Sequence, residues 1–392
     1  MRFVMFYHSL VSDWNHGNAH FLRGICTELL AAGHEVAVYE PQKGWSLDNL
    51  QRDHGTAPLA AFARYYPQLK TSFYEDQSLQ LDEVLSGADV VLVHEWNSPE
   101  FVRAIGIHRR SHHYKLLFHD THHRAVTAPH QMAKYDLTHY DGVLAFGDML
   151  KDLYLKQGWA ERAWTWHEAA DTRLFRPGDS RPLEGDLVWI GNWGDEERSE
   201  ELRTCLIEPV KQLRLRASVY GVRYPATALW TLQQANIRYG GWLPNFEAPE
   251  VFGRYRVTVH IPRRPYRESI SGIPTIRVFE ALACGIPLVC LHWDDCEGLF
   301  TPGKDYLVAK TPAEMTRCVR DILHDPALAQ RLSQHGLQTI AARHTCAHRV
   351  AELLAICQEL HDQRDPQHDR HRTLPLPPKS SRPQSTSAPA SR

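Results

Sequence analysis

The chain has 392 residues and carries 44 Lys and Arg against 46 Asp and Glu, a net charge of -2. The length predicts roughly two domains of 100–200 residues, and the balanced charge argues against nucleic acid, which needs a basic surface. No apolar run approaches the roughly 18 residues of a membrane span, which leaves peripheral membrane attachment open, and 8 scattered cysteines without a C-x-x-C pair indicate reduced thiols in the cytosol.

The first half of the chain alternates short apolar runs with segments of helical periodicity. Strands are predicted where the apolar runs are short, at residues 2–7, 35–41, 88–96, 114–120 and 141–147. Residues 21–34 between the first two runs show the 3.6-residue period of a helix and end at Gly33, a common helix stop. This alternation predicts a parallel sheet flanked by helices, a doubly wound α/β domain over residues 1–172.

A second series of the same kind follows a linker rich in Pro and Gly. Short β-rich runs occur at residues 187–194, 216–221, 235–241, 256–262 and 287–293. Helical patterns between residues 311 and 361 close the series, which predicts a second doubly wound domain over residues 173–364. After about Asp365 the composition turns to Pro, Ser, Arg, His and Gln, so residues 365–392 are predicted to be a disordered tail.

Two such domains in series are expected to face one cleft, because ligands bind beyond the carboxyl ends of parallel strands. The loop after the first strand, HSLVSDWNHGNAH, lacks both the G-x-G-x-x-G motif and the Walker A lysine. A nicotinamide oxidoreductase and a P-loop nucleotidase are therefore disfavoured. Gly17 and Asn18 can let the backbone approach an acceptor or a phosphate at the start of a helix, and an ordinary turn with an N-cap is the alternative.

The loop FHDTHHR, residues 118–124, is dense in histidine. Phe118 is predicted to end a strand, which would put His119 and Asp120 at the strand tip as catalytic candidates. His122 and His123 are interpreted as surface-loop residues in a histidine-rich chain. A zinc hydrolase stays open because His-x-x-His can bind a metal, although no third ligand follows at a matching spacing.

The loop IGNWGDEER, residues 190–198, starts the second domain. Its glycines are expected to leave backbone N–H groups free at a helix start, where an anion can bind, and Arg198 lies one turn further on. Gly191, Asn192 and Arg198 are therefore candidates for binding a diphosphate. The three acidic residues at 195–197 fit an ordinary capped helix equally well.

The segment from His260 to Pro287 combines arginines, prolines and one carboxylate in an apolar helix. Arg263 supplies positive charge, Ser271 precedes a helix that is predicted to begin at Pro274, and Glu280 falls near the second turn. A carboxylate facing the cleft can accept two hydrogen bonds from a vicinal diol such as ribose. The alternative is a structural ion pair between Glu280 and Arg277.

These segments together resemble the GT-B glycosyltransferases, especially the retaining group-1 enzymes and the CgeB-like branch named after a spore-maturation protein. The resemblance spans nearly all of the chain up to the tail and is most specific in RVFEALACGIPLVCLHWDDCEGLFTPGKDYLVA. The other segments that carry it are GNAHFLRGICTELLAAGHEVAVYEP, FHDTHHR, EAADTRLFRP and GNWGDEER.

The resemblance implies that Glu280 binds the ribose of a nucleotide sugar and that His119 faces the transferred sugar. One position departs from the pattern: many group-1 enzymes have a further Glu where this chain has Gly272. Contact with the sugar would then come from backbone amides between Ser271 and Thr275. The usual Arg and Lys phosphate pair is also not matched, and its candidate replacements are Arg198, Arg263 and Arg264.

The resemblance further implies a UDP- or GDP-linked sugar as substrate, no cofactor, no metal and retention of anomeric configuration. The expected acceptor is a glycan, a lipid or another cell-envelope component, as in polysaccharide biosynthesis, and aromatic residues in first-domain loops are expected near it. Two rival functions remain open. One is a non-catalytic nucleotide- or glycan-binding protein with this fold, suggested by Gly272, and the other is the histidine-metal hydrolase.

Overall fold

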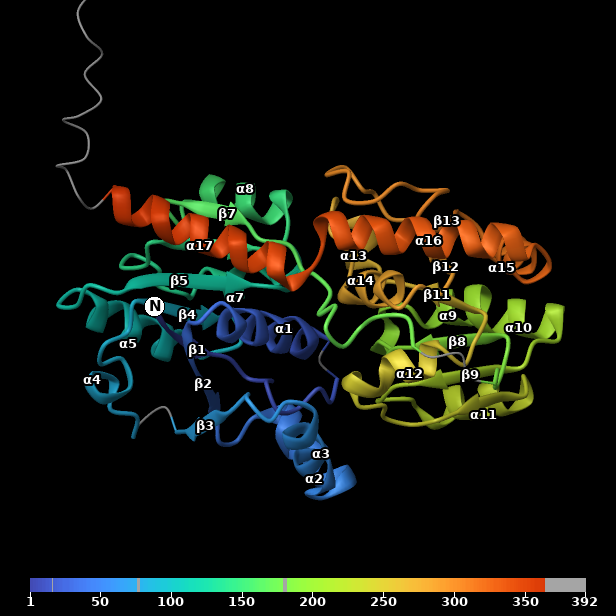
Figure 1. Ribbon diagram of the computed structural model, residues 1–392, viewed down its shortest axis with the longest axis horizontal. Coiled ribbons are helices and arrows are strands. Elements are labelled where there is room, and N and C mark those ends of the chain that lie inside the picture. The colour runs from blue at the N-terminus through green and yellow to red at the C-terminus, as the bar shows by residue number, and fades with distance from the viewer. Residues whose placement is uncertain (16, 76–77, 179–181, 364–392) are drawn as a thin grey trace, which may run out of the picture.

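The computed structural model describes residues 1–15, 17–75, 78–178 and 182–363. The predicted tail, 365–392, lies outside the described residues. Two α/β domains lie side by side, each built on one parallel sheet (Figure 1). The predicted fold class, two doubly wound domains, is confirmed.

The first sheet has seven strands in the order β3-β2-β1-β4-β5-β6-β7. Its central strands are mostly apolar because helices cover both faces; β4, for example, is buried throughout. The strands are β1 (Arg2–Phe6), β2 (Glu35–Pro41), β3 (Thr71–Tyr74), β4 (Val90–His94), β5 (Lys115–Asp120), β6 (Gly142–Ala145) and β7 (Ala163–Thr165). The helices are α1 (Asn18–Ala31), α2 (Trp45–His54), α3 (Ala57–Tyr65), α4 (Leu81–Val84), α5 (Pro99–Arg109), α6 (Arg124–Thr127), α7 (Pro129–Met132) and α8 (Asp148–Lys156).

The second sheet has six strands in the order β10-β9-β8-β11-β12-β13. They are β8 (Leu187–Ile190), β9 (Ala217–Tyr220), β10 (Ile237–Tyr239), β11 (Val257–His260), β12 (Leu288–Leu291) and β13 (Leu307–Ala309). The helices are α9 (Ser199–Leu202), α10 (Glu208–Leu213), α11 (Ala226–Gln234), α12 (Ala248–Phe252), α13 (Pro265–Glu268), α14 (Ile276–Ala283), α15 (Pro312–His324), α16 (Pro326–Arg343) and α17 (Cys346–Asp362). In each sheet the strand order reverses beside its first strand, the position where doubly wound sheets bind ligands.

The last helix, α17, returns to the first domain and packs against α1 (Figure 1). The indole N–H of Trp166 donates to the carbonyl of Arg349 at 2.8 Å, and the indole N–H of Trp164 donates to Glu359 at 3.1 Å. Leu353 and Leu360 bury the apolar side of the helix. Helix α17, at the end of the predicted second domain, thus connects the two domains. The sequence did not indicate this placement.

The two domains approach closely where α1 begins. A Cβ atom on Gly17, the residue before α1, would lie 2.7 Å from Cγ2 of Ile276 at the start of α14. A side chain at position 17 would therefore push the two domains apart. Among the described helices, none combines the length and the apolar character needed to cross a bilayer.

Candidate functional site

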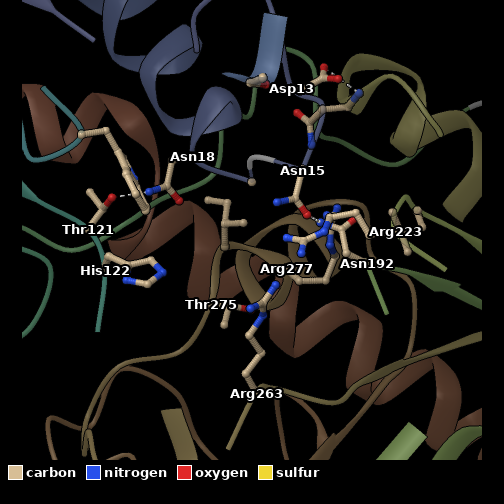
Figure 2. Close-up of a pocket in the computed structure, with 18 of the residues that line it drawn as sticks. Asp13, Asn15, Asn18, Thr121, His122, Asn192, Arg223, Arg263, Thr275 and Arg277 are labelled. Atoms are coloured by element: carbon tan, nitrogen blue, oxygen red, sulfur yellow. Dashed lines mark hydrogen bonds between the residues drawn. The ribbon is translucent and has the colours of Figure 1, made fainter. Parts of the chain in front are cut away.

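A cavity of about 750 Å³ lies between the domains. Its lining includes residues that follow the carboxyl ends of central strands in both sheets, such as His8 after β1, Thr121 after β5, Gly191 after β8 and Ile261 after β11. This is the position at which open parallel sheets bind ligands. The cleft expected from the sequence is therefore present, and Figure 2 shows part of its lining.

The first-domain wall carries polar and aromatic side chains. The side-chain amide of Asn18 donates to the hydroxyl of Thr121, which places the start of α1 beside the end of β5 (Figure 2). The indoles of Trp45 and Trp96 line the same cavity, and these residues are 50% and 39% exposed. The guanidinium of Arg124 lies over the Trp96 ring at 4.0 Å and covers part of it, and the remaining exposed indole surface can pack against the apolar face of a ligand ring.

Asp13 joins this wall to the second domain. Its carboxylate accepts from the indole N–H of Trp242 at 3.1 Å and from the backbone N–H of Asn245 at 3.0 Å. Arg23 of α1 donates to the same carboxylate at 2.8 Å, so the negative charge of Asp13 is paired. The carboxylate therefore fixes the relative position of the two walls rather than adding free charge to the cavity.

Four arginines line the second-domain wall. They are Arg198, Arg223, Arg263 and Arg277, of which three are labelled in Figure 2. Among the described residues the cavity lining holds two carboxylates, Asp13 and Glu168. Burial, followed by the nearby charge of Glu280, raises the pKa of Glu168 to about 8, which favours its neutral form at pH 7. Three of the four arginines pair with carboxylates outside the lining, Arg223 with Asp195, Arg263 with Glu197 and Arg277 with Glu280. The wall therefore offers an anion guanidinium hydrogen-bond donors rather than unpaired positive charge.

Arg198 is the most enclosed of these arginines. It donates to the carbonyl of Ile261 at 2.9 Å and to the carbonyl of Asn192 at 2.6 Å. Burial first, and then the neighbouring charges of Arg263 and Arg277, lower the pKa of Arg198 to about 9. A bound anion would offset this mutual repulsion, so the arginine cluster favours occupation by phosphate groups.

Glu280 is fully buried and is not among the residues that line the cavity. It accepts from the side-chain amide of Asn245 at 2.6 Å, pairs with Arg277 and lies 3.3 Å from Nδ1 of His20. Burial alone would raise its pKa, but Arg277, His20 and Asn245 outweigh burial and hold the pKa below the usual value.

The ion pair between Glu280 and Arg277, which the sequence analysis gave as the alternative, is therefore present. Asn245 and Arg277 both line the cavity, so Glu280 holds two lining side chains in place from behind. The direct contact with ribose that the resemblance implies stays a prediction.

His119 and Asp120 also lie outside the cavity lining. Strand β5 ends at Asp120, as the predicted apolar run 114–120 does, so the placement of the strand end at Phe118 within that run is wrong. Both side chains are buried in the sheet. His119 Nδ1 shares a hydrogen bond of 2.7 Å with the hydroxyl of Tyr7, and burial lowers the pKa of His119 to about 3. The residues that pass beyond the sheet edge and line the cavity are Thr121 and His122.

Asp120 organises this end of the strand. Its carboxylate accepts from the hydroxyl of Tyr154 at 2.8 Å and from the backbone N–H of His122 at 3.0 Å. Burial raises the pKa of Asp120 to about 6. These bonds hold the turn that presents His122 to the cavity, so a catalytic role for Asp120 itself stays a prediction.

The segment before α14 reaches the cavity at one of its three predicted residues. Thr275 lines the cavity and is the N-cap of α14, which begins at Ile276; the predicted start at Pro274 is wrong. Ser271 and Gly272 do not line it. The backbone N–H of Gly272 donates to the carbonyl of Asp294 at 2.7 Å, so this amide is already engaged and does not fit the predicted contact with a sugar.

The segment after β8 reaches the cavity as expected but with different chemistry. Gly191 and Asn192 both line it. The backbone N–H of Gly191 donates to the carbonyl of Tyr220 at 2.8 Å, so the expectation of a free amide there is wrong. The side chain of Asn192 accepts from the backbone N–H of Val222 at 3.0 Å and donates to Asn15 across the domain boundary. Asn192 thus connects the domains, as Figure 2 shows.

Comparison with known proteins supports a glycosyltransferase. Residues 202–355 match a family model described as glycosyl transferase-like. No curated protein matches the sequence.

Solved structures similar to almost the whole chain include a sucrose-phosphate synthase from Thermosynechococcus elongatus, with 14% identity, a TM-score of 0.61 and coverage of 93% of this chain and 100% of that one. Anabaena HepE in complex with UDP and glucose is similar at 12% identity and a TM-score of 0.61, covering 91% and 99%. An α-glucosyltransferase in complex with UDP-glucose and DNA containing an abasic site is similar at 10% identity and a TM-score of 0.67, covering 91% and 99%. At these identities the likeness shows the fold, which is GT-B.

Proposed function

We propose that this protein is a glycosyltransferase that moves a sugar from a nucleoside diphosphate sugar to an acceptor. The observation that carries the proposal is the arginine-lined wall of the interdomain cavity, formed by Arg198, Arg223, Arg263 and Arg277. The family match over residues 202–355 and the likeness to structures that hold UDP support the same function.

The donor is expected to bind with its diphosphate on this wall. Arg263 lines the cavity and its side chain is 23% exposed, so it can reach a ligand there, where the ligand would compete with Glu197, its ion-pair partner at 2.9 Å. Arg277 lines the same wall from the first turn of α14. Guanidinium groups stabilise the charge that develops on a departing diphosphate, and this is the contribution of the arginines to the reaction.

The acceptor is expected on the first-domain wall, against Trp45 and Trp96. Their exposed indoles suit a sugar ring, so we expect a glycan or another carbohydrate-bearing cell-envelope component. The net charge of -2 argues against a nucleic acid acceptor. His122 lies on this side of the cavity and is the candidate to contact the transferred sugar or the acceptor.

A retaining outcome and a UDP- or GDP-linked donor follow from the resemblance and belong to this proposal. In such a reaction the bond between the anomeric carbon and the diphosphate oxygen breaks, a bond to the acceptor oxygen forms on the same face, and the acceptor proton passes to the departing phosphate oxygen. The arginine wall would hold that oxygen in place throughout.

The test is incubation of the full chain with a panel of nucleotide sugars and measurement of released nucleoside diphosphate. We expect release with one donor, and NMR of the product should show the anomeric configuration of the donor. Tight nucleotide binding without release would support the non-catalytic alternative. Neither binding nor release with any donor would contradict the proposal.

A further inference from the structure

Two histidines at the end of α5 stack on each other far from the cavity. His108 and His112 are four residues apart, with ring centroids 3.8 Å apart and an angle of 3° between the planes. In Figure 1, α4 and α5 lie at the outer end of the first domain, away from the second domain. Helix α5 begins beside Ser98 at the cavity edge, and its axis carries His108 roughly 15 Å from that edge.

Asp82 of α4 brings a carboxylate to this pair. Its Oδ1 atom lies 3.0 Å from Nε2 of His108 and 3.8 Å from Nε2 of His112. The three ligand atoms all lie within 4.8 Å of one another. Ligand atoms around a tetrahedral zinc ion lie roughly 3.3 Å apart, because zinc binds nitrogen and oxygen at about 2.0–2.2 Å. Small side-chain rotations would therefore give coordination geometry.

Hydrogen bonds behind the rings orient both histidines toward this point. Nδ1 of His112 lies 2.7 Å from the carbonyl of His108, and a carbonyl only accepts, so Nδ1 of a neutral His112 carries the proton. Nε2 of His112 then presents a lone pair to Asp82. Nδ1 of His108 is bonded to the hydroxyl of Tyr114 at 3.0 Å, the type of outer bond that fixes a metal-binding imidazole.

Two acceptors thus face each other, the lone pair of His112 and the carboxylate of Asp82. A divalent cation between them satisfies all three groups at once. The Asp82 side chain is 86% exposed and that of His112 is 42% exposed, so an ion has an open path and water can fill the fourth position.

We infer that Asp82, His108 and His112 form a binding site for a divalent transition-metal ion of the zinc class. Two imidazoles and one carboxylate are a ligand set that zinc prefers. The ion would fasten α4 to the end of α5, at the edge of the sheet opposite the cavity. Its role is therefore structural, and the site is separate from the sugar-transfer chemistry.

The test is calorimetric titration of the chelator-treated full chain with Zn²⁺, repeated with Co²⁺ to obtain the absorption of the bound ion. We expect one tight site whose affinity falls at least 100-fold in His112→Ala and in Asp82→Asn, beyond the roughly 10- to 100-fold loss typical of outer-shell changes. The matched control is His113→Ala, which removes the adjacent exposed histidine and should bind like wild type.

Tyr114→Phe probes the outer bond without touching a ligand, and we expect it to weaken binding roughly 10- to 100-fold. Tetrahedral Co²⁺ absorption should appear in wild type and be absent in His112→Ala. Equal zinc affinity in wild type and His112→Ala would overturn the inference and assign the ion to other histidines. Absence of zinc binding by the folded wild-type protein would overturn it as well.

Discussion

Glu280→Gln tests how the donor wall is held in place. The wild-type carboxylate is fully buried and shares its oxygens between Asn245 and Arg277. Glutamine keeps the shape and one acceptor oxygen, so the bond from Asn245 can remain. Its amide N–H groups would face the guanidinium of Arg277, which loses its charge partner and its fixed orientation.

The expected cost follows from the burial of this pair. Removing one partner of a buried ion pair costs about 3–5 kcal/mol. The Arg277 side chain is 19% exposed, so water in the cavity can solvate part of its charge. We therefore expect the lower end, about 3 kcal/mol. For a domain of about 150–250 residues this lowers the melting temperature by roughly 6–12 °C.

Scanning calorimetry of wild type, Glu280→Gln and Glu268→Gln measures this effect, since Glu268 is an exposed carboxylate in the same domain. The control should melt with the wild type. The double variant Arg277→Met/Glu280→Gln should cost less than the sum of its single variants, because both remove the same pair. If Glu280→Gln melts with the wild type but binds nucleoside diphosphate sugar more weakly, the structural explanation is wrong and Glu280 contacts the donor directly.

Two further substitutions test the site. Gly17→Ala should destabilise the protein by about 1–3 kcal/mol, because the new Cβ would overlap Ile276. Gly178→Ala is the control and should leave the stability unchanged, because no atom lies within contact distance of its Cβ position. Chemical denaturation measures both free energies of unfolding. Glu168→Gln concerns pH: burial and then Glu280 raise the pKa of Glu168 from 4.5 to about 8, so the stability linked to its proton is complete below about pH 4.5 and is lost as the pH rises through 8. The melting temperature of Glu168→Gln relative to that of the wild type should rise between about pH 5 and pH 9. A difference between the two melting temperatures that stays constant with pH would refute the assignment.

The central strands could be predicted from the sequence because strands buried on both faces read as continuous apolar runs. The short edge strands β3 and β7 could not, since they are partly exposed and their composition is mixed. The packing of α17 against the first domain could not be predicted from the sequence either. Its apolar stripe shows that one face is buried but not which surface covers it.

The candidate site was predictable where it depends on position after a strand. Gly17, Asn18, Gly191, Asn192 and Thr275 line the cavity for that reason.

His119 was wrongly predicted to face the cavity because the strand end was placed at Phe118, two residues before the true end of β5. A shift of two residues at a strand end decides whether a side chain is buried in the sheet or lies in the loop beyond it. Arg223 and Asn245 were missed because the segments after β9 and β10 carry no distinctive motif; Arg223 lies in a loop and Asn245 begins a short 3-10 helix. Glu168 lies in the linker segment used for the resemblance, and only its burial in the folded protein marks it as unusual.

The central claim is that the arginine wall of the cavity binds the diphosphate of the donor. Calorimetric titration of wild type, Arg263→Ala and Arg317→Ala with UDP, GDP and ADP tests it most directly, because Arg317 is a 57% exposed arginine on α15 outside the cavity lining. We expect one nucleotide to bind tightly to wild type and to Arg317→Ala, and roughly 10- to 150-fold more weakly to Arg263→Ala, the loss expected for a hydrogen bond to a charged group. Equal affinity in all three proteins, or no binding by the folded wild type, would contradict the claim.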